Sequence, residues 1–193
     1  MPSEIEIKLP VPSAAKGRRM LRAAGFQIFH RRVFEANTLF DTPSHSLRRA
    51  GSLLRVREAG PQGILTYKGP PIPGKHKERE ELEVEISDPR RFIDLLSRVG
   101  FQPKLRYEKH RTEFRRPHQA GLAMLDETPI GVFLELEGHP AWIDRNARAL
   151  GFRESDYITL SYLELYRRYC RQHGLRPGHM TFQLTSSRSS SSQ

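Results

Sequence analysis

The sequence predicts an α+β fold in which an eight-stranded antiparallel sheet carries charges on one face and helices against the other. Segment after segment alternates charged and apolar residues with a period of two, so each kind occupies its own strand face. Short turn-like connections, such as Gly60-Pro61-Gln62-Gly63, join neighbouring strands as hairpins and favour antiparallel pairing. Helical segments end at glycines that suit a left-handed C′ position, namely Gly25, Gly100 and Gly151.

The first predicted strand, Glu4-Ile5-Glu6-Ile7-Lys8-Leu9, shows the alternation most clearly. As a strand it places Glu4, Glu6 and Lys8 on one face, with the two carboxylates about 7 Å apart. A single strand of this kind is most simply explained as a solvated face, but the pattern recurs along the chain. The predicted strands are 3–9, 27–40, 52–59, 62–69, 78–87, 104–116, 120–127 and 130–138.

Helix signals occur between and after the strands. The first helix is expected to begin at Ser13 and the third to follow Pro140. The second has the clearest start, because Asp88 is a typical N-cap and Pro89 fits the first helical position. A last helix, at about 161–173, presents aromatic and leucine side chains as a docking face.

Length and composition limit the organisation of the chain. Its 193 residues suffice for one well-buried domain, which we expect at 1–175, followed by a serine-rich, disordered tail at 176–193. The single cysteine, Cys170, excludes an intramolecular disulfide and fits a reducing compartment. The first ten residues carry two glutamates and no apolar run, so we expect no signal peptide, and no apolar run reaches membrane-spanning length. We therefore expect a cytoplasmic protein with no membrane partner; the sequence does not indicate its oligomeric state.

The net charge of +10 indicates an anionic partner. Arg-Arg doublets are scattered along the chain instead of being concentrated in one arm or helix, and no aromatic-basic RNA motif accompanies them. Nucleic acid is therefore a disfavoured partner.

The alternating strands supply a matched set of charged side chains. The acids are Glu4, Glu6, Asp126, Glu135 and Glu137, and the bases are Lys8, Arg55, Arg57, Lys68, Lys109 and Arg111. If the sheet closes into a barrel with helices outside, these side chains line the interior. Carboxylates bind Mg²⁺ or Mn²⁺, and arginine and lysine match phosphate oxygens, so the set fits a metal-bound polyphosphate. The alternative is a sheet with surface ion pairs, each worth little.

Ordered motifs make the chain resemble the CYTH domain family, the triphosphate tunnel metalloenzymes. The N-terminal Glu-x-Glu-x-Lys signature is Glu4 to Lys8. The further matches, in order, are Phe40-Asp41-Thr42-Pro43, Leu53-Leu54-Arg55-Val56-Arg57, Thr66-Tyr67-Lys68-Gly69-Pro70, Arg79-Glu80-Glu81-Leu82-Glu83, Tyr107-Glu108-Lys109-His110-Arg111, Leu125-Asp126-Glu127, Phe133-Leu134-Glu135-Leu136-Glu137 and Ser161-Tyr162-Leu163-Glu164-Leu165. The resemblance covers about residues 3–170 and implies an eight-stranded antiparallel β-barrel tunnel with a charged interior and helices outside.

The resemblance also implies roles for the charged residues. The metal-binding acids would be Glu4, Glu6, Asp126, Glu135 and Glu137; the triphosphate-binding bases would be Lys8, Arg55, Arg57, Lys68, Arg79, Lys109 and Arg111. Catalysis would rest on Glu4, Glu6, Lys8, Glu135 and Glu137 with Mg²⁺ or Mn²⁺, while Glu81 and Glu83 would tether neighbouring bases. Some members have a lysine just before the C-terminal Ser-Tyr where this chain has Leu160. This difference weakens the expectation of a basic gate from the last helix, and Tyr162 fits a packing role equally well.

Two reactions fit this chemistry. The first is a CyaB-like class IV adenylyl cyclase that converts ATP to cyclic AMP and pyrophosphate. The second is a hydrolase of tripolyphosphate, thiamine triphosphate or a nucleoside triphosphate. A non-catalytic module that binds polyphosphate or nucleotide is a third hypothesis, but pure anion binding gains nothing from five inward carboxylates.

Overall fold

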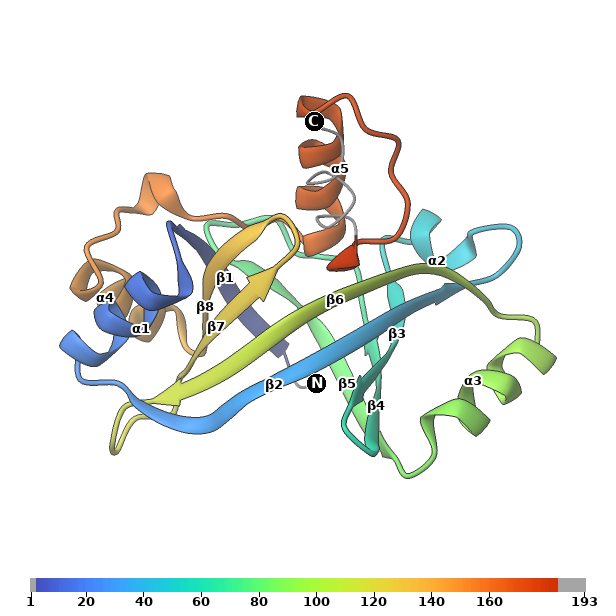
Figure 1. The fold of residues 1–193 in the computed structure, drawn as a ribbon, viewed down its shortest axis with the longest axis horizontal. Coiled ribbons are helices and arrows are strands. Elements are labelled where there is room, and N and C mark those ends of the chain that lie inside the picture. Colours follow the sequence, from blue (N-terminus) through green and yellow to red (C-terminus); the bar gives the residue numbers. More distant parts are fainter. Residues whose placement is uncertain (1–2, 184–193) are drawn as a thin grey trace, which may run out of the picture.

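A computed structural model describes residues 3–183 and contains one closed barrel (Figure 1). The strand order is β1-β5-β4-β3-β2-β6-β7-β8, and neighbouring strands are antiparallel. The strands are β1 (Ser3–Val11), β2 (Gln27–Asp41), β3 (Leu53–Ala59), β4 (Gln62–Lys68), β5 (Lys77–Ile86), β6 (Gln102–Arg115), β7 (Leu122–Thr128) and β8 (Gly131–Glu137). The predicted strand limits differ from these by at most two residues, so the α+β barrel is confirmed.

The long helices begin and end at the predicted signals. They are α1 (Ala14–Ala23), α3 (Pro89–Arg98), α4 (Pro140–Ala149) and α5 (Tyr162–Gln172). The side chains of Ser13, Asp88 and Ser161 each accept a hydrogen bond from a backbone N–H of the first turn. The glycines after the first three of these helices have φ values of 82°, 95° and 87°, as a left-handed C′ residue requires.

Two short elements were not predicted. They are α2 (Ser46–Arg49) and a single 3₁₀ turn at Glu154–Asp156. The buried Asp41 carboxylate stabilises α2 by accepting hydrogen bonds from the backbone N–H groups of Leu47 and Arg48, both at 3.0 Å. An element of one turn is too short to show a hydrophobic period. Among the helices of residues 3–183, none is both long and apolar enough to cross a membrane.

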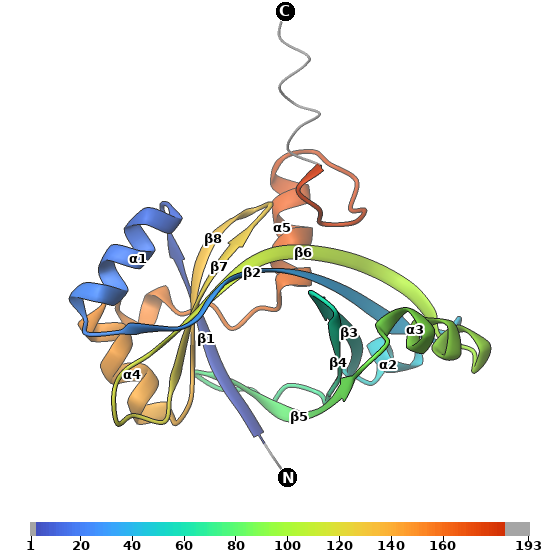
Figure 2. The same cartoon turned by 60° about the horizontal axis from the view of Figure 1, so that its bottom comes forward.

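The helices cover the outer face of the barrel in separate places (Figure 2). Helices α1 and α4 lie on one side, where residues such as Leu21 and Ile143 pack against Ile7, Leu125 and Leu134 of the strands. Helix α3 lies on the opposite side, over an apolar cluster centred on Val56 and Leu96. Because the apolar face of each strand is outside, its charged face is inside the barrel.

The wall of the barrel changes partway along β1. The strand pairs with β5 over Ser3–Glu6, and beyond this point the backbone of Lys8 pairs instead with Ile158, with N···O distances of 2.9 and 3.0 Å. The segment before α5 therefore continues the wall, and it brings the first turn of α5 to the barrel interior.

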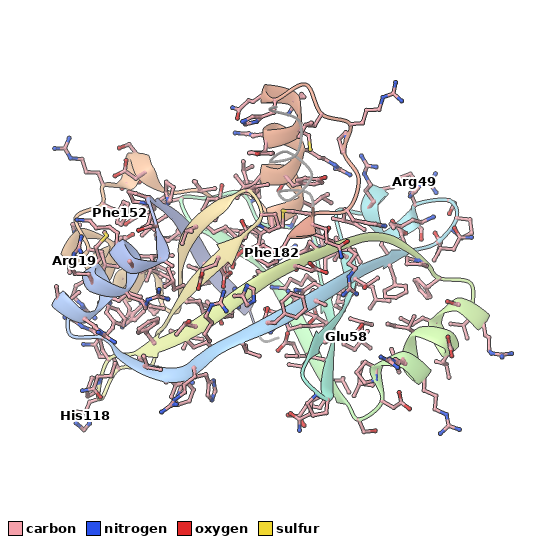
Figure 3. The ribbon with its side chains drawn as sticks, viewed as in Figure 1. Arg19, Arg49, Glu58, His118, Phe152 and Phe182 are labelled. Atoms are coloured by element: carbon pink, nitrogen blue, oxygen red, sulfur yellow. The ribbon has the colours of Figure 1, made fainter. Side chains whose placement is uncertain are left out.

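Residues beyond the predicted domain boundary at 175 contact the barrel. Met180 is buried, and its backbone pairs with β6 at Tyr107. The ring of Phe182, labelled in Figure 3, lies 5.0 Å from that of His110 on β6. Met180 and Phe182 thus pack against β6, and the boundary at 175 stays a prediction. The remaining serine-rich segment, 184–193, lies outside the described residues, and its disorder stays a prediction.

Gly121 offers a test of the packing on the α4 side. A Cβ at this position would lie 2.3 Å from the ring of Trp142, which is buried in the α1/α4 cluster. Gly121→Ala should therefore destabilise the fold by about 1–3 kcal/mol, as overpacking usually does. Thermal unfolding should show a melting temperature lower by several degrees. Gly178→Ala, whose Cβ would meet no atom within 4 Å, is the control and should leave the melting temperature unchanged. Equal melting temperatures for the two variants would contradict the packing described.

Candidate active site in the barrel interior

A cavity of about 1150 Å³ runs through the barrel, and charged side chains line it. All the bases predicted for the site contribute to its wall: Lys8, Arg55, Arg57, Lys68, Arg79, Lys109 and Arg111. Of the predicted acids, Glu4, Glu6, Glu135 and Glu137 line it as well. Asp126 does not line the cavity; it is fully buried behind Lys109 and Arg111, to which it is bonded. The barrel therefore brings the whole predicted set to one interior.

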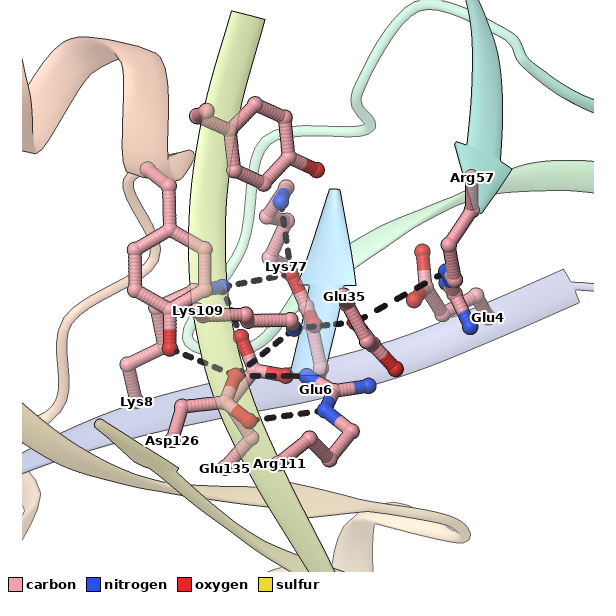
Figure 4. Close-up of polar contacts among 12 residues, drawn as sticks. Glu4, Glu6, Lys8, Glu35, Arg57, Lys77, Lys109, Arg111, Asp126 and Glu135 are labelled. Atoms are coloured by element: carbon pink, nitrogen blue, oxygen red, sulfur yellow. Dashed lines mark hydrogen bonds and ion pairs between the residues drawn. The ribbon is translucent and has the colours of Figure 1, made fainter. Parts of the chain in front are cut away.

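Glu6 of β1 and Glu135 of β8 are paired with lysines (Figure 4). Glu6 accepts hydrogen bonds on Oε1 from Lys8 Nζ at 2.8 Å and from Lys77 Nζ at 2.6 Å. Lys8 also contacts Glu135, with Nζ 3.1 Å from Oε1. Burial alone would lower the pKa of Lys8, but Glu135 and Glu6 reverse this effect and raise it. Lys8 is therefore held as a cation between two strands.

Asp126 is the anchor of a second group of bases. Arg111 donates to it through two nitrogens, Nε to Oδ1 at 2.7 Å and Nη2 to Oδ2 at 2.6 Å, and Lys109 Nζ donates to Oδ2 at 2.8 Å. Arg111 also donates to Glu135. Burial would raise the pKa of Asp126, but the charges of Arg111 and Lys109 lower it to about 2. Asp126 is thus committed to holding two bases, which makes it a weaker candidate for a metal ligand than the sequence suggests.

The bases of β3, β4 and β5 are tethered in a similar way. Lys68 contacts Glu4 and Glu81, and Arg55 contacts Glu81 and Glu83. These contacts give Glu81 and Glu83 the tethering position expected of them. Each base is held in place while part of its hydrogen-bonding capacity stays unused.

Several buried polar atoms of this interior have no hydrogen-bond partner within residues 3–183. They include the Nε atoms of Arg55, Arg57 and Arg79, both amide atoms of Asn37 and one oxygen of Glu35. Buried polar groups are normally hydrogen-bonded, because leaving one unpaired costs about 1–3 kcal/mol. An anion with several oxygen atoms could satisfy the three guanidinium groups at once. The interior therefore has the hydrogen-bond donors of an anion-binding site.

Glu137 differs from the other acids because no base is hydrogen-bonded to it in the described structure. Burial, with Glu4 and Glu6 nearby, raises its pKa to about 7. A divalent cation would offset this crowding of carboxylates, and Mg²⁺ commonly takes only one or two protein carboxylates alongside water and phosphate. Within residues 3–183, no three acidic, histidine or cysteine side chains are already arranged to hold a metal. The donor chemistry therefore fits a cation that is shared with a phosphate ligand.

Some interior residues were missed by sequence reasoning. Lys77 follows a loop rich in proline and glycine and was not included in the site. Glu35 and Asn37 lie on β2, where register shifts interrupt the alternation at neighbouring positions. Tyr107 and Tyr162 belong to an apolar cluster under α5, yet their hydroxyl groups bond to Arg55 and Asp126. The period-two signal was present for Glu35 and Asn37, and for Tyr107, which shares a strand face with Lys109 and Arg111; for Tyr162, only packing was indicated.

Comparison with known proteins agrees with this geometry. A protein of Methanocaldococcus jannaschii that carries the provisional name of adenylate cyclase is 29% identical, and the match covers 84% of this chain and 97% of that one. The PH1012 protein of Pyrococcus horikoshii is 28% identical, with a TM-score of 0.71 over 84% of this chain and 98% of that one. A provisional adenylyl cyclase from Hippeastrum, described as having a dominant triphosphatase activity, shares the fold at 20% identity. Its TM-score is 0.66 over 92% of this chain and 98% of that one.

The family model of the CYTH domain matches residues 2–145. These residues contain all eight strands of the barrel and every charged side chain predicted for the site. The chain belongs to the CYTH domain family.

Proposed function

We propose that this protein is a metal-dependent enzyme that acts on a triphosphate inside the barrel, and that its reaction is the cyclisation of ATP to cyclic AMP and pyrophosphate. The observation that carries the proposal is the set of three arginines in the cavity wall, Arg55, Arg57 and Arg79, whose buried Nε atoms have no hydrogen-bond partner in the described structure. Proteins of the CYTH family act on triphosphates. A triphosphate carries about four negative charges at neutral pH, which matches a wall of this kind.

The bases have the role of binding and orienting the phosphate chain. Arginine forks and lysine ammonium groups form strong, charge-assisted hydrogen bonds to phosphate oxygens. Because Asp126, Glu81 and Glu83 hold the bases before a ligand arrives, little reorganisation is needed when charge develops on the phosphates. Such preorganised bases stabilise the transition state of phosphoryl or nucleotidyl transfer.

The glutamates of β1 and β8 have the role of holding Mg²⁺ or Mn²⁺, and we assign this role to Glu4, Glu6, Glu135 and Glu137. When bound, the divalent cation neutralises phosphate charge and helps to orient the reacting groups. We assign Asp126 to anchoring Arg111 and Lys109, because it is buried outside the cavity wall and both its oxygens accept their hydrogen bonds.

In the cyclisation, the 3′-hydroxyl oxygen of ATP forms a bond to the α-phosphorus, and the bond from this phosphorus to the bridging oxygen of the β-phosphate breaks. Pyrophosphate leaves and the hydroxyl proton is released. The name carried by the M. jannaschii relative supports this reaction. Apolar residues at the cavity wall, including Phe40, Leu53 and Leu163, offer a surface for an organic group.

Hydrolysis of a triphosphate is the second candidate. The charged interior complements phosphates and a cation, and these are common to both reactions. Water then takes the place of the 3′-hydroxyl group, and tripolyphosphate is the simplest substrate. The products separate the two candidates: purified protein with Mg²⁺ or Mn²⁺ should convert ATP to cyclic AMP and pyrophosphate. Release of orthophosphate from tripolyphosphate, without cyclic AMP from ATP, would establish hydrolysis instead; no product from either would contradict the enzymatic proposal.

Two glutamate variants test the metal assignment. Glu6→Gln and Glu135→Gln should each lower the turnover rate at least about a hundredfold, because each removes a charge that holds the cation. Steady-state kinetics checks the rate, and thermal unfolding checks that the barrel remains folded. Asp94→Asn, on the exposed surface of α3, is a control for loss of a carboxylate and should keep full activity. Near-wild-type rates in either glutamate variant would overturn the assignment.

Arg57 tests the role of the bases. Arg57→Ala removes a guanidinium group whose Nε has no hydrogen-bond partner in the described structure, so it should raise the KM for the triphosphate by about tenfold or more. Enzyme kinetics over a range of substrate concentrations measures this effect. An unchanged KM would show that Arg57 does not contact the substrate.

Glu137 gives a pH-dependent test. Its pKa is about 7 in the folded state against a usual 4.5, so the folded state retains a proton that the unfolded state releases in this interval. The associated stability is present below about pH 4.5 and is lost as the pH rises through about 7. Glu137→Gln should therefore be more stable than the wild type at pH 8 but not at pH 4.5, as measured by thermal unfolding. Mg²⁺ at pH 8 should stabilise the wild type more than the variant; a difference that is the same at both pH values would contradict this account.

A further inference from the structure

Tyr162 occupies an unusual position for the first residue of a surface helix. Its side chain is 7% exposed and lies in the wall of the charged cavity. Its hydroxyl group donates to Asp126 Oδ2 at 2.8 Å. The ammonium groups of Lys8 and Lys109 lie over its ring, with Nζ 5.1 and 5.3 Å from the ring centroid. One side chain of α5 therefore contacts charged groups from β1, β6 and β7.

These contacts converge on residues to which we assign phosphate binding. Asp126 Oδ2 accepts hydrogen bonds from Lys109 and Arg111 as well as from Tyr162. The hydroxyl group thus helps to fix the carboxylate that fixes both bases. The ring adds a cation–π contact to Lys109 and to Lys8, which stands on another strand. A residue that only packed α5 against the barrel would need none of these polar contacts.

The start of α5 is itself held firmly against the barrel. Ser161 and Glu164 form a capping box, in which each side chain bonds to the other residue's backbone N–H. Just before it, Ile158 pairs with the backbone of Lys8. On the outer side of Tyr162, Tyr166 and Cys170 are buried in the apolar cluster under α5. Tyr162 therefore has a defined place relative to β1, and its contacts to the bases are not those of a mobile side chain.

We propose that Tyr162 is a positioning residue for phosphate binding. Its hydroxyl group orients Lys109 and Arg111 through Asp126, and its ring orients the ammonium groups of Lys8 and Lys109. The proposal rests on the proposed function in one respect, that the ligand of these bases is a phosphate chain. It assigns to α5 a part in the site: the helix orients bases that stand on the barrel strands.

The test measures binding of tripolyphosphate by isothermal titration calorimetry in the presence of EDTA, so that it does not depend on turnover. Tyr162→Phe keeps the ring and removes the hydroxyl group; it should weaken binding about three- to tenfold. Tyr162→Leu also removes the ring and should weaken binding by a further factor of about three. Tyr166→Phe is the matched control, because its hydroxyl group, on the same helix, donates to the backbone of His179 and to none of the bases. It should bind tripolyphosphate like the wild type.

A double-mutant cycle separates positioning from packing. If Tyr162 acts through Asp126, Tyr162→Phe should weaken binding much less in an Asp126→Asn background than in the wild type. Thermal unfolding shows whether Asp126→Asn folds. Should it fail to fold, Lys109→Met replaces it in the cycle, and the effect of Tyr162→Phe should again be reduced.

The outcomes distinguish this proposal from the proposed function. Unchanged binding in Tyr162→Phe, or losses that multiply independently in the cycle, would overturn the positioning role even if the wild type is an active enzyme. Tight binding by the wild type without turnover in Mg²⁺ would overturn the proposed function alone, and the cycle would still decide the role of Tyr162. Absence of binding by the wild type both in EDTA and in Mg²⁺ would overturn both.

Discussion

Closure of the sheet into a barrel determines where the charged and the apolar side chains of every strand lie. A strand that alternates charged and apolar residues must direct one set inward once the sheet is closed, and the helices take the apolar set. The charged set is then removed from bulk water. Inside the barrel, an isolated charged side chain would be too unfavourable to remain ionised. Acids and bases are consequently paired across strands, as Lys8 is with Glu6 and Glu135. The same pairing that makes the interior tolerable also fixes the side chains that the proposed chemistry uses.

The pairing is uneven, and this unevenness gives the interior its character. Asp126 is saturated with donors, whereas Glu137 is hydrogen-bonded to no base within the described residues. The guanidinium Nε atoms of Arg55 and Arg57 likewise have no hydrogen-bond partner there. The interior thus has a carboxylate without a base at one place and guanidinium donors without acceptors at another. This distribution suits a cation and an anion that bind together. A metal–triphosphate complex has this distribution of charge.

Much of the fold and of the site could be predicted from the sequence, because both follow from one period-two pattern. Glu4, Glu6 and Lys8 were predicted from alternation alone, and they line the cavity. Partners could not be predicted, because which charges meet depends on the register between strands: Arg111 lies opposite Asp126 only once β6 and β7 are aligned. Lys77 is the first residue of β5, directly after a loop rich in proline and glycine, so the sequence pattern did not place it on a strand face. Tyr162 was missed because a helical pattern of aromatics indicates packing and cannot show that a hydroxyl group reaches into a barrel.

A crystal structure of the protein with tripolyphosphate and Mg²⁺ would show whether the phosphate chain binds inside the barrel. We expect it there, with its oxygens within hydrogen-bond distance of the Nε atoms of Arg55, Arg57 and Arg79, and the cation beside Glu137. A phosphate chain bound to the basic outer surface, with the interior ion pairs unchanged, would contradict it.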